Sequence, residues 1–146
     1  MFKQKPTYRQ YSAYLIFMLA ACGGAFIWQL CLPQLGGQFT SWGSAPGWQR
    51  EIALWNTGLI VAIVASLVKR NTEYAKILVI QATVLCWVLG VNHLVSFVQN
   101  ASAQYLLHIM GVFEVLLLGG IWGLVLVCRL LFAGKAAQSG AGRAAK

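Results

Sequence analysis

The chain has 146 residues, of which 59% are hydrophobic and only 10% charged, and its mean hydropathy is +0.68. Soluble domains carry about 25% charged residues, and a soluble fold this apolar would expose large patches that aggregate. The composition therefore argues against a soluble domain and predicts a protein whose solvent is lipid.

The net charge of +8 comes from eleven Lys and Arg against three acidic residues. The basic residues lie in short segments that flank apolar runs, so they favour a role in membrane insertion over a nucleic-acid partner. They also predict binding of anionic lipid headgroups at the membrane surface.

Four apolar runs are long enough to span a bilayer, which needs roughly 20 residues per helix. Backbone groups in lipid must be paired internally, so the runs predict an all-α, four-helix transmembrane domain over 11–132. A basic tail, 1–10, precedes this domain, and a small, polar segment, 133–146, predicts a disordered tail after it. The four spans cover approximately residues 11–32, 52–68, 77–98 and 105–132.

Within the first run, Leu19-Ala20-Ala21-Cys22 has the form of a bacterial lipoprotein cleavage site. The apolar run continues from Gly23 to Leu32, whereas a cleaved signal normally gives way to polar chain. An uncleaved spanning helix is therefore expected, with processing at Cys22 as the alternative.

The connection over 33–50 is rich in Gly and Pro, which predicts that it contains no regular helix. It also carries Phe39, Trp42 and Trp48, and indole rings prefer the headgroup region. The loop is expected to lie on the outer surface as a flap. An aromatic lid over a pocket is the alternative.

Basic residues are unevenly distributed among the connecting segments. Ten lie in the two tails, at the end of the fourth run and in the 69–76 connection, and only Arg50 lies in the other two connections. The positive-inside rule then places both termini in the cytoplasm.

Polar residues within the spans are costly in lipid, so each requires a reason. On the third run Gln81, Leu85, Val88, Asn92 and Gln99 share a face, which is expected to point into the bundle. Glu114 lies closest to mid-membrane, with His93 as its expected partner. The depth of these residues predicts a polar cluster in the outer leaflet that comprises Glu51, Asn56, Asn92, His93, His108 and Glu114.

Small residues predict where helices approach closely: Gly58, Ala62 and Ala65 in the second run, and Gly119 and Gly123 in the fourth.

Three interpretations of the polar cluster remain open. The first is interhelical hydrogen bonding that holds the bundle together. The second is a haem or a metal ion held between His93 and His108. The third is a protonatable pair of Glu114 and a histidine beside a quinone or another amphipathic ligand. No complete catalytic signature is present, and the four cysteines lack the Cys-x-x-Cys spacing of zinc sites.

The second and third runs also carry a family resemblance. The segments 48–52, 55–58 and 89–93 resemble those of small four-helix bacterial inner-membrane proteins of the DoxX-like kind. The resemblance implies an inner-membrane protein linked with thiol or quinone redox systems, although this chain has no paired cysteines in a catalytic arrangement. The implied motif positions are Glu51, Asn56, Gly90 and His93.

These observations together predict a multi-pass bacterial inner-membrane protein with a non-catalytic binding, accessory or assembly role. A membrane redox component that binds quinone or haem is one alternative, and a small oligomeric transporter is another. A membrane-protein partner or a second copy of the chain is the expected type of protein partner.

Overall fold

The computed structural model describes residues 4–144, and their side chains as far as Ala133. Four helices in this range are long and apolar enough to cross a membrane, and the range contains no strand, which confirms the predicted all-α four-helix membrane bundle. The elements are α1 (Tyr8–Cys31), α2 (Gln34–Phe39), α3 (Pro46–Lys69), α4 (Thr72–Gln99), α5 (Leu106–Met110), the π-helix η1 (Gly111–Ile121) and α6 (Trp122–Ala144).

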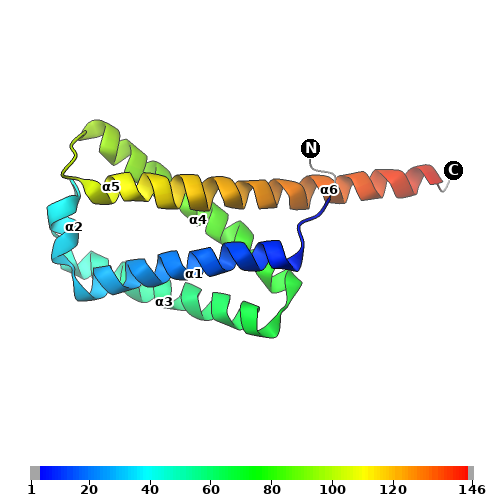
Figure 1. Ribbon diagram of the computed structural model, residues 1–146, viewed down its shortest axis with the longest axis horizontal. Coiled ribbons are helices and arrows are strands. Elements are labelled where there is room, and N and C mark those ends of the chain that lie inside the picture. Colours follow the sequence, from blue (N-terminus) through cyan, green and yellow to red (C-terminus); the bar gives the residue numbers. More distant parts are fainter. Residues whose placement is uncertain (1–3, 145–146) are drawn as a thin grey trace.

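The fourth span combines α5, η1 and the first part of α6 into one continuous helix that extends beyond the rest of the bundle (Figure 1). Its backbone is helical as far as Ala144, across most of the segment 133–146 for which the composition predicts a disordered tail. The side chains of that segment beyond Ala133 lie outside the described residues.

The connection between the first two spans differs from its prediction. It contains the helix α2 despite Gly36 and Gly37, and α3 begins at Pro46 rather than near residue 52. A proline suits the first helical position because the amide hydrogen that it lacks would have no partner there. The prediction that Gly and Pro exclude helix from this connection is therefore wrong.

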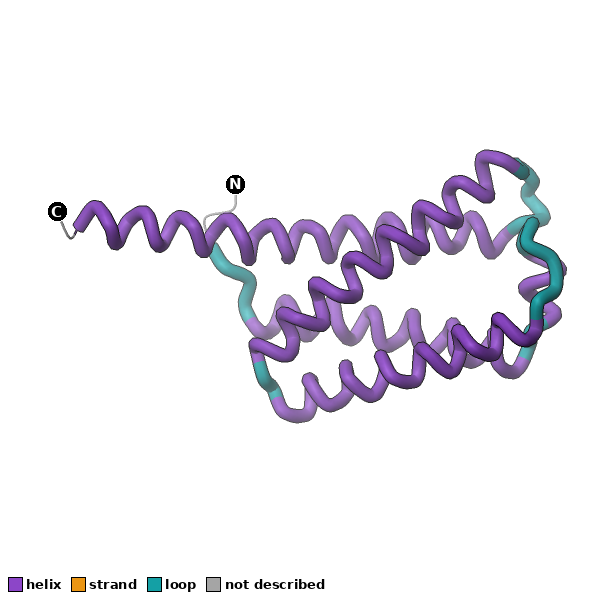
Figure 2. Tube along the Cα trace, turned by 180° about the vertical axis from the view of Figure 1, so that it is seen from behind, coloured by secondary structure: helices purple, strands orange, loops and turns teal. Residues whose placement is uncertain are grey.

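The two ends of the bundle differ in their basic residues. Both chain termini lie at one end, together with the turn from Lys69 to Asn71, and we call this the basic end (Figure 2). The opposite end, which carries α2, the segment 40–45 and the connection 100–105, is the aromatic end. At the basic end α3 and α4 are joined tightly, because Arg70 adopts a left-handed conformation (φ 49°) and Asn71 caps α4.

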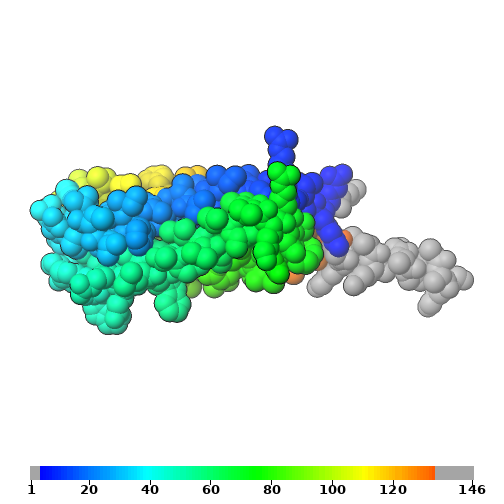
Figure 3. Space-filling view, turned by 90° about the horizontal axis from the view of Figure 1, so that it is seen from below, coloured from blue at the N-terminus to red at the C-terminus, as the bar shows by residue number. Residues whose placement is uncertain are grey.

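Two helix pairs make the most extensive contacts, α1 with α3 and α4 with the continuous fourth helix (Figure 1). Figure 3 shows α1 and α3 side by side, with side chains near the start of α3 projecting from this face. The core lies between α1, α3, α4 and α6. Its largest fully buried hydrophobic residues are Tyr11, Tyr14, Leu15, Ile63 and Val79.

Glycines allow α4 and η1 to approach closely. A Cβ atom at Gly90 would lie 2.7 Å from Cα of Leu116, and one at Gly119 would lie 2.6 Å from Sγ of Cys86. Gly123 similarly faces Thr83 and Tyr14. The small-residue contact predicted for the fourth span is therefore confirmed.

Two predicted inward faces are wrong. Gly58 and Ala65 of α3 are exposed, and a Cβ atom at Gly58 would meet nothing within 4 Å. On α4, Gln81, Val88 and Asn92 are also exposed. The face of α4 that packs inward instead carries smaller residues and lies about a third of a turn away around the helix. Its buried members are Ala75, Val79, Ala82, Thr83, Cys86, Gly90 and Ser96. Small side chains at these positions let the neighbouring helices come closer than the predicted stripe would.

Candidate functional site

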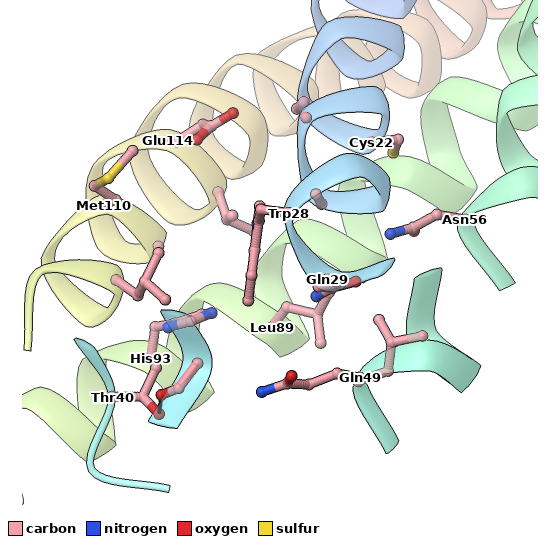
Figure 4. Close-up of a pocket in the computed structure, with 18 of the residues that line it drawn as sticks. Cys22, Trp28, Gln29, Thr40, Gln49, Asn56, Leu89, His93, Met110 and Glu114 are labelled. Carbon is pink, nitrogen blue, oxygen red and sulfur yellow. Dashed lines mark hydrogen bonds between the residues drawn. The ribbon is translucent and has the colours of Figure 1, made fainter. Parts of the chain in front are cut away.

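A pocket of about 510 Å³ lies in the half of the bundle nearer the aromatic end. Side chains from α1, α3, α4, α5 and η1 line it, together with residues of α2 and the segment after it. Most of its wall is apolar. Figure 4 shows Trp28 of α1 and Glu114 of η1 on facing sides, with Leu89 and His93 of α4 beneath them.

The pocket is open to the surface of the bundle at more than one place. Gly24 of α1 and Met110 of α5 line it and are exposed, which leaves it open between the first helix and the fourth. Trp42, Gly43 and Trp48 also line it and are exposed, nearer the aromatic end.

A pair of imidazoles lies beside the pocket. Nδ1 of His93 is 3.3 Å from Nδ1 of His108, and His108 is completely buried. On the far side of His108, its Nε2 lies 3.0 Å from both the backbone nitrogen and Oγ of Ser41. Gly111 leaves the room that the ring of His93 occupies, because a Cβ atom there would overlap it.

These contacts determine where the imidazole hydrogens lie. The backbone N–H of Ser41 can only donate, so Nε2 of His108 accepts and carries no hydrogen. The neutral ring of His108 then has its hydrogen on Nδ1 and donates it to Nδ1 of His93. His93 is consequently also neutral, with its own hydrogen on Nε2.

Trp42 closes this part of the site. Its ring centroid is 4.9 Å from that of His93 and 4.6 Å from that of His108, and its Nε1 donates to Oγ of Ser96 at 2.8 Å. Trp42 and Trp48 both line the pocket and are both exposed, at 51% and 71%. The contacts of Trp42 with the two histidines favour the aromatic lid for this residue, and the exposure of Trp48 is that expected of an indole at the headgroup level.

Several polar side chains line the pocket but have no hydrogen-bond partner in the described part of the chain. On α1 and α3 they are Gln29, Gln49 and Asn56, and on η1 it is Glu114. The carbonyl oxygens of Gln29 and Gln49 are fully shielded from the surroundings and still unpaired. A buried polar group without a partner costs roughly 1–3 kcal/mol, so the two glutamine oxygens require an explanation. Outside the pocket, the hydroxyl groups of Tyr11, Ser12 and Ser66 are buried and unpaired in the described part of the chain as well.

The predicted polar cluster is brought together only in part. His93 and His108 are in contact, and Asn56, His93 and Glu114 line the same pocket. Glu51 and Asn92 are exposed and are absent from its lining. No contact joins Glu114 to His93, the partner expected from depth, because His93 bonds to His108 instead.

Sequence reasoning missed the residues that lie near the ends of helices. Gln29 is polar within the first apolar run, which was a detectable signal. Ser41 and Gln49 belong to the connection after that run, and their roles depend on how it folds back. No sequence pattern indicated that contact. Trp42, in the same connection, was anticipated through the alternative of an aromatic lid.

The π-helix positions Glu114 near the core. Its wider turn leaves carbonyl groups for other partners, and Tyr14 Oη donates to the oxygen of Gly119 at 3.0 Å. Trp87 Nε1 donates to the oxygen of Gly120 at 3.1 Å. Side chains of α1 and α4 thus hold η1 in place below the pocket.

The geometry does not fit a haem iron or another metal ion between the two histidines. Metal–imidazole bonds are about 2 Å long, so two ligating nitrogens would lie about 4 Å apart across the ion. Here the facing nitrogens are 3.3 Å apart and share a hydrogen, and the remaining nitrogen of His108 is bonded to Ser41. Among the described residues, no group of three or more His, Cys, Asp or Glu could hold a metal ion.

Comparison of the chain with protein-family models, with curated proteins and with solved structures gives no match. The resemblance to DoxX-like proteins therefore stays a prediction. The four membrane-spanning helices and the pocket between them define the chain as a small multi-pass membrane protein with a candidate ligand site.

Proposed function

We propose that this small integral membrane protein binds an amphipathic ligand in the pocket between α1 and the fourth helix. The observation that carries the proposal is the set of unpartnered polar side chains on the pocket wall: Gln29, Gln49, Asn56 and Glu114. Within a bilayer such groups need a partner from the protein, from water held in the pocket or from a ligand, and a ligand would supply partners for the set.

The volume and the wall support the same function. Small-molecule sites commonly measure about 300–1,000 Å³ and combine a mostly apolar lining with a few polar groups that orient the ligand. The pocket has about 510 Å³ and fits this description. Its lateral opening at Gly24 and Met110 favours a ligand that arrives through the membrane.

Interhelical hydrogen bonding explains only one part of the polar cluster. It accounts for His93, His108 and Ser41, which join α4, α5 and the segment after α2. It does not account for Glu114 or Asn56, which bond to no helix in the described chain. A binding role explains both the hydrogen-bonded histidines and the unpartnered residues. The histidines form a fixed wall beside the ligand, and Glu114 and Asn56 are available to contact it.

The proposed setting is a bacterial inner membrane, with the basic end in the cytoplasm and the pocket in the outer leaflet. The bias of Lys and Arg toward the basic end supports this orientation. The protein acts there as a binding or accessory component and performs no chemistry of its own.

Two neighbouring glycines offer a matched test. Gly24 lines the pocket and Gly23 does not, and a Cβ atom at either would meet nothing within 4 Å. Gly24→Phe should fill the pocket without disturbing the fold, while Gly23→Phe should place the same ring elsewhere on α1. Native mass spectrometry of protein released from detergent micelles reports on any retained ligand.

We expect the wild type and Gly23→Phe to retain a bound molecule of defined mass, and Gly24→Phe to lose it. An equal spectrum for all three proteins, with or without adducts, would contradict the proposed function. In that case the polar groups of the pocket are satisfied by water alone.

A further inference from the structure

We infer that the pocket selects an uncharged lipid whose head group carries hydroxyl groups, with His93 as donor to it and Gln29 and Gln49 as acceptors from it. This inference rests on the proposed function and specifies its ligand. It follows from the kinds of hydrogen-bonding atom that the pocket presents.

The donor is the N–H of His93. Because His108 donates to Nδ1 of His93, the hydrogen of His93 must lie on Nε2. Figure 4 shows this ring extending from α4 into the space below Trp28. Nε2 has no partner in the described part of the chain, so it is available to an acceptor on the ligand.

The acceptors are the amide oxygens of two glutamines. Oε1 of Gln29 and Oε1 of Gln49 are shielded and unpaired, and both residues line the pocket. In Figure 4 the side chain of Gln49 reaches from α3 toward the part of the pocket that holds Thr40 and His93. These two oxygens require donors from the ligand.

The combination of donors and acceptors restricts the head group. A hydroxyl both donates and accepts, whereas an ammonium only donates and a carboxylate only accepts. An ammonium cannot accept the N–H of His93. A carboxylate can accept it, and could also accept from the amide N–H groups of Gln29 and Gln49, so hydrogen bonding alone excludes only the ammonium. A hydroxyl group can pair with all three residues without bringing a charge into the pocket.

The charged residues of the pocket lining also favour an uncharged head group. Among the described residues that line the pocket, none is Lys or Arg, and Glu114 is the one acidic residue. A phosphate or carboxylate head group would therefore enter a pocket whose lining holds no cation to balance it. Arg50, the nearest basic residue in sequence, is exposed and lies outside the lining.

The rest of the pocket suits an acyl chain. Away from the glutamines most of the lining is apolar, with Asn56 and Glu114 as its polar members; the apolar part includes Phe17, Met18, Cys22, Leu85, Cys86 and Val115. These residues offer a largely apolar surface that continues toward the core. A single-chain lipid with its head group at Gln49 and its chain toward Met18 therefore matches the polarity of the pocket along its length.

Four oleoyl compounds with one chain length test the inference: monoolein, methyl oleate, oleic acid and oleylamine. Monoolein carries hydroxyl groups, and methyl oleate carries an ester that accepts hydrogen bonds but cannot donate one. Oleic acid carries a carboxylic acid, and oleylamine carries an amine. Equilibrium titration followed by native mass spectrometry gives the dissociation constants. We expect monoolein to bind about tenfold or more tightly than oleic acid and oleylamine, from the cost of one unsatisfied buried group.

Variants then locate the contact. Gln49→Leu should weaken monoolein binding about 3- to 10-fold, the effect of one lost hydrogen bond, and should leave methyl oleate unchanged because that ester has no hydrogen to donate. Gln38→Leu, on the exposed surface of α2 and outside the lining, is the matched control and should change neither affinity. Loss of methyl oleate binding in Gln49→Leu would indicate a damaged pocket, and Gln29→Leu then provides the same comparison from α1.

The outcomes separate the two proposals. Tighter binding of oleic acid or oleylamine than of monoolein would overturn the head-group inference and leave the proposed binding function intact. Equal weakening of monoolein by Gln49→Leu and Gln38→Leu would also overturn it. Failure of the wild type to bind all four compounds, together with identical behaviour of Gly23→Phe and Gly24→Phe, would overturn both.

Discussion

The π-helix η1 has two neighbours that it meets in different ways. Against α4 its backbone comes into near contact, since Gly90 leaves no space for a side chain beside Leu116. Toward α1 the same helix is separated by the pocket, and the two meet only below it, where Tyr14 bonds to Gly119. One helix thus serves as a packing partner on one side and as a pocket wall on the other.

This difference shows how a four-helix bundle can contain both a firm framework and a binding site. The seam between α4 and η1 relies on van der Waals contact through glycine, a common basis of helix association in lipid. The separation of α1 from η1 is maintained at the aromatic end by α2 and the segment 40–45. That segment is anchored through Ser41 and Trp42 to the fourth and third spans.

The largest effect is expected from adding a side chain where α4 and η1 pack most closely. In Gly90→Ala the new methyl group would lie 2.7 Å from Cα of Leu116, where only backbone movement can relieve the overlap. Such overpacking costs about 1–3 kcal/mol in the free energy of unfolding. Chemical unfolding in detergent measures the change.

Gly58→Ala is the control, because it adds the same methyl group to open space on α3. It should leave stability unchanged or raise it by up to about 1 kcal/mol through helix propensity. Equal destabilisation by the two variants would show that the contact between Gly90 and Leu116 is absent.

An intermediate effect is expected where the segment after α2 is anchored. His108→Phe removes the bonds to Ser41 and His93 and leaves the N–H of Ser41 without its acceptor. We expect a loss of about 1–2 kcal/mol and faster hydrogen exchange at the Ser41 amide. Asn92→Leu, on the exposed face of α4 beside His93, should leave that exchange rate unchanged. Faster exchange in both variants would contradict the anchoring contact.

The smallest effect concerns the contact of α1 with η1. Tyr14→Phe removes the hydrogen bond to the oxygen of Gly119 and should lower the free energy of unfolding by about 0.5–1.5 kcal/mol. Tyr11→Phe is matched in burial, but the Tyr11 hydroxyl has no partner, so its removal should be neutral or stabilising. Thermal unfolding of the two variants side by side distinguishes them, and the reverse order would argue against the bond from Tyr14.

The number of spans was predictable because it depends on length and hydropathy alone. Their rotation was not, and the third span shows why. Its polar residues suggested an inward face through Gln81 and Asn92, but both are exposed. The helix instead turns its small residues, among them Cys86 and Gly90, toward η1, because close packing gains more contact there than two amides would.

The candidate site was predictable in the same limited way. His93, His108, Asn56 and Glu114 were identified from depth in the membrane, since polar residues in apolar runs are individually visible. The other wall of the pocket comes from Gln49 and the segment after α2. Its position depends on hydrogen bonds between residues 67 apart in sequence, which periodicity cannot reveal.

Photo-crosslinking in a bilayer tests the central claim most directly. A benzophenone amino acid at Leu107 faces the pocket, and one at Phe113, which is 61% exposed, faces bulk lipid. In phosphatidylcholine nanodiscs that contain a small fraction of monoolein, the adducts at 107 should be enriched in monoolein over its share of the bilayer. The adducts at 113 should match the bulk composition. Bulk composition at both positions would contradict a selective lipid pocket.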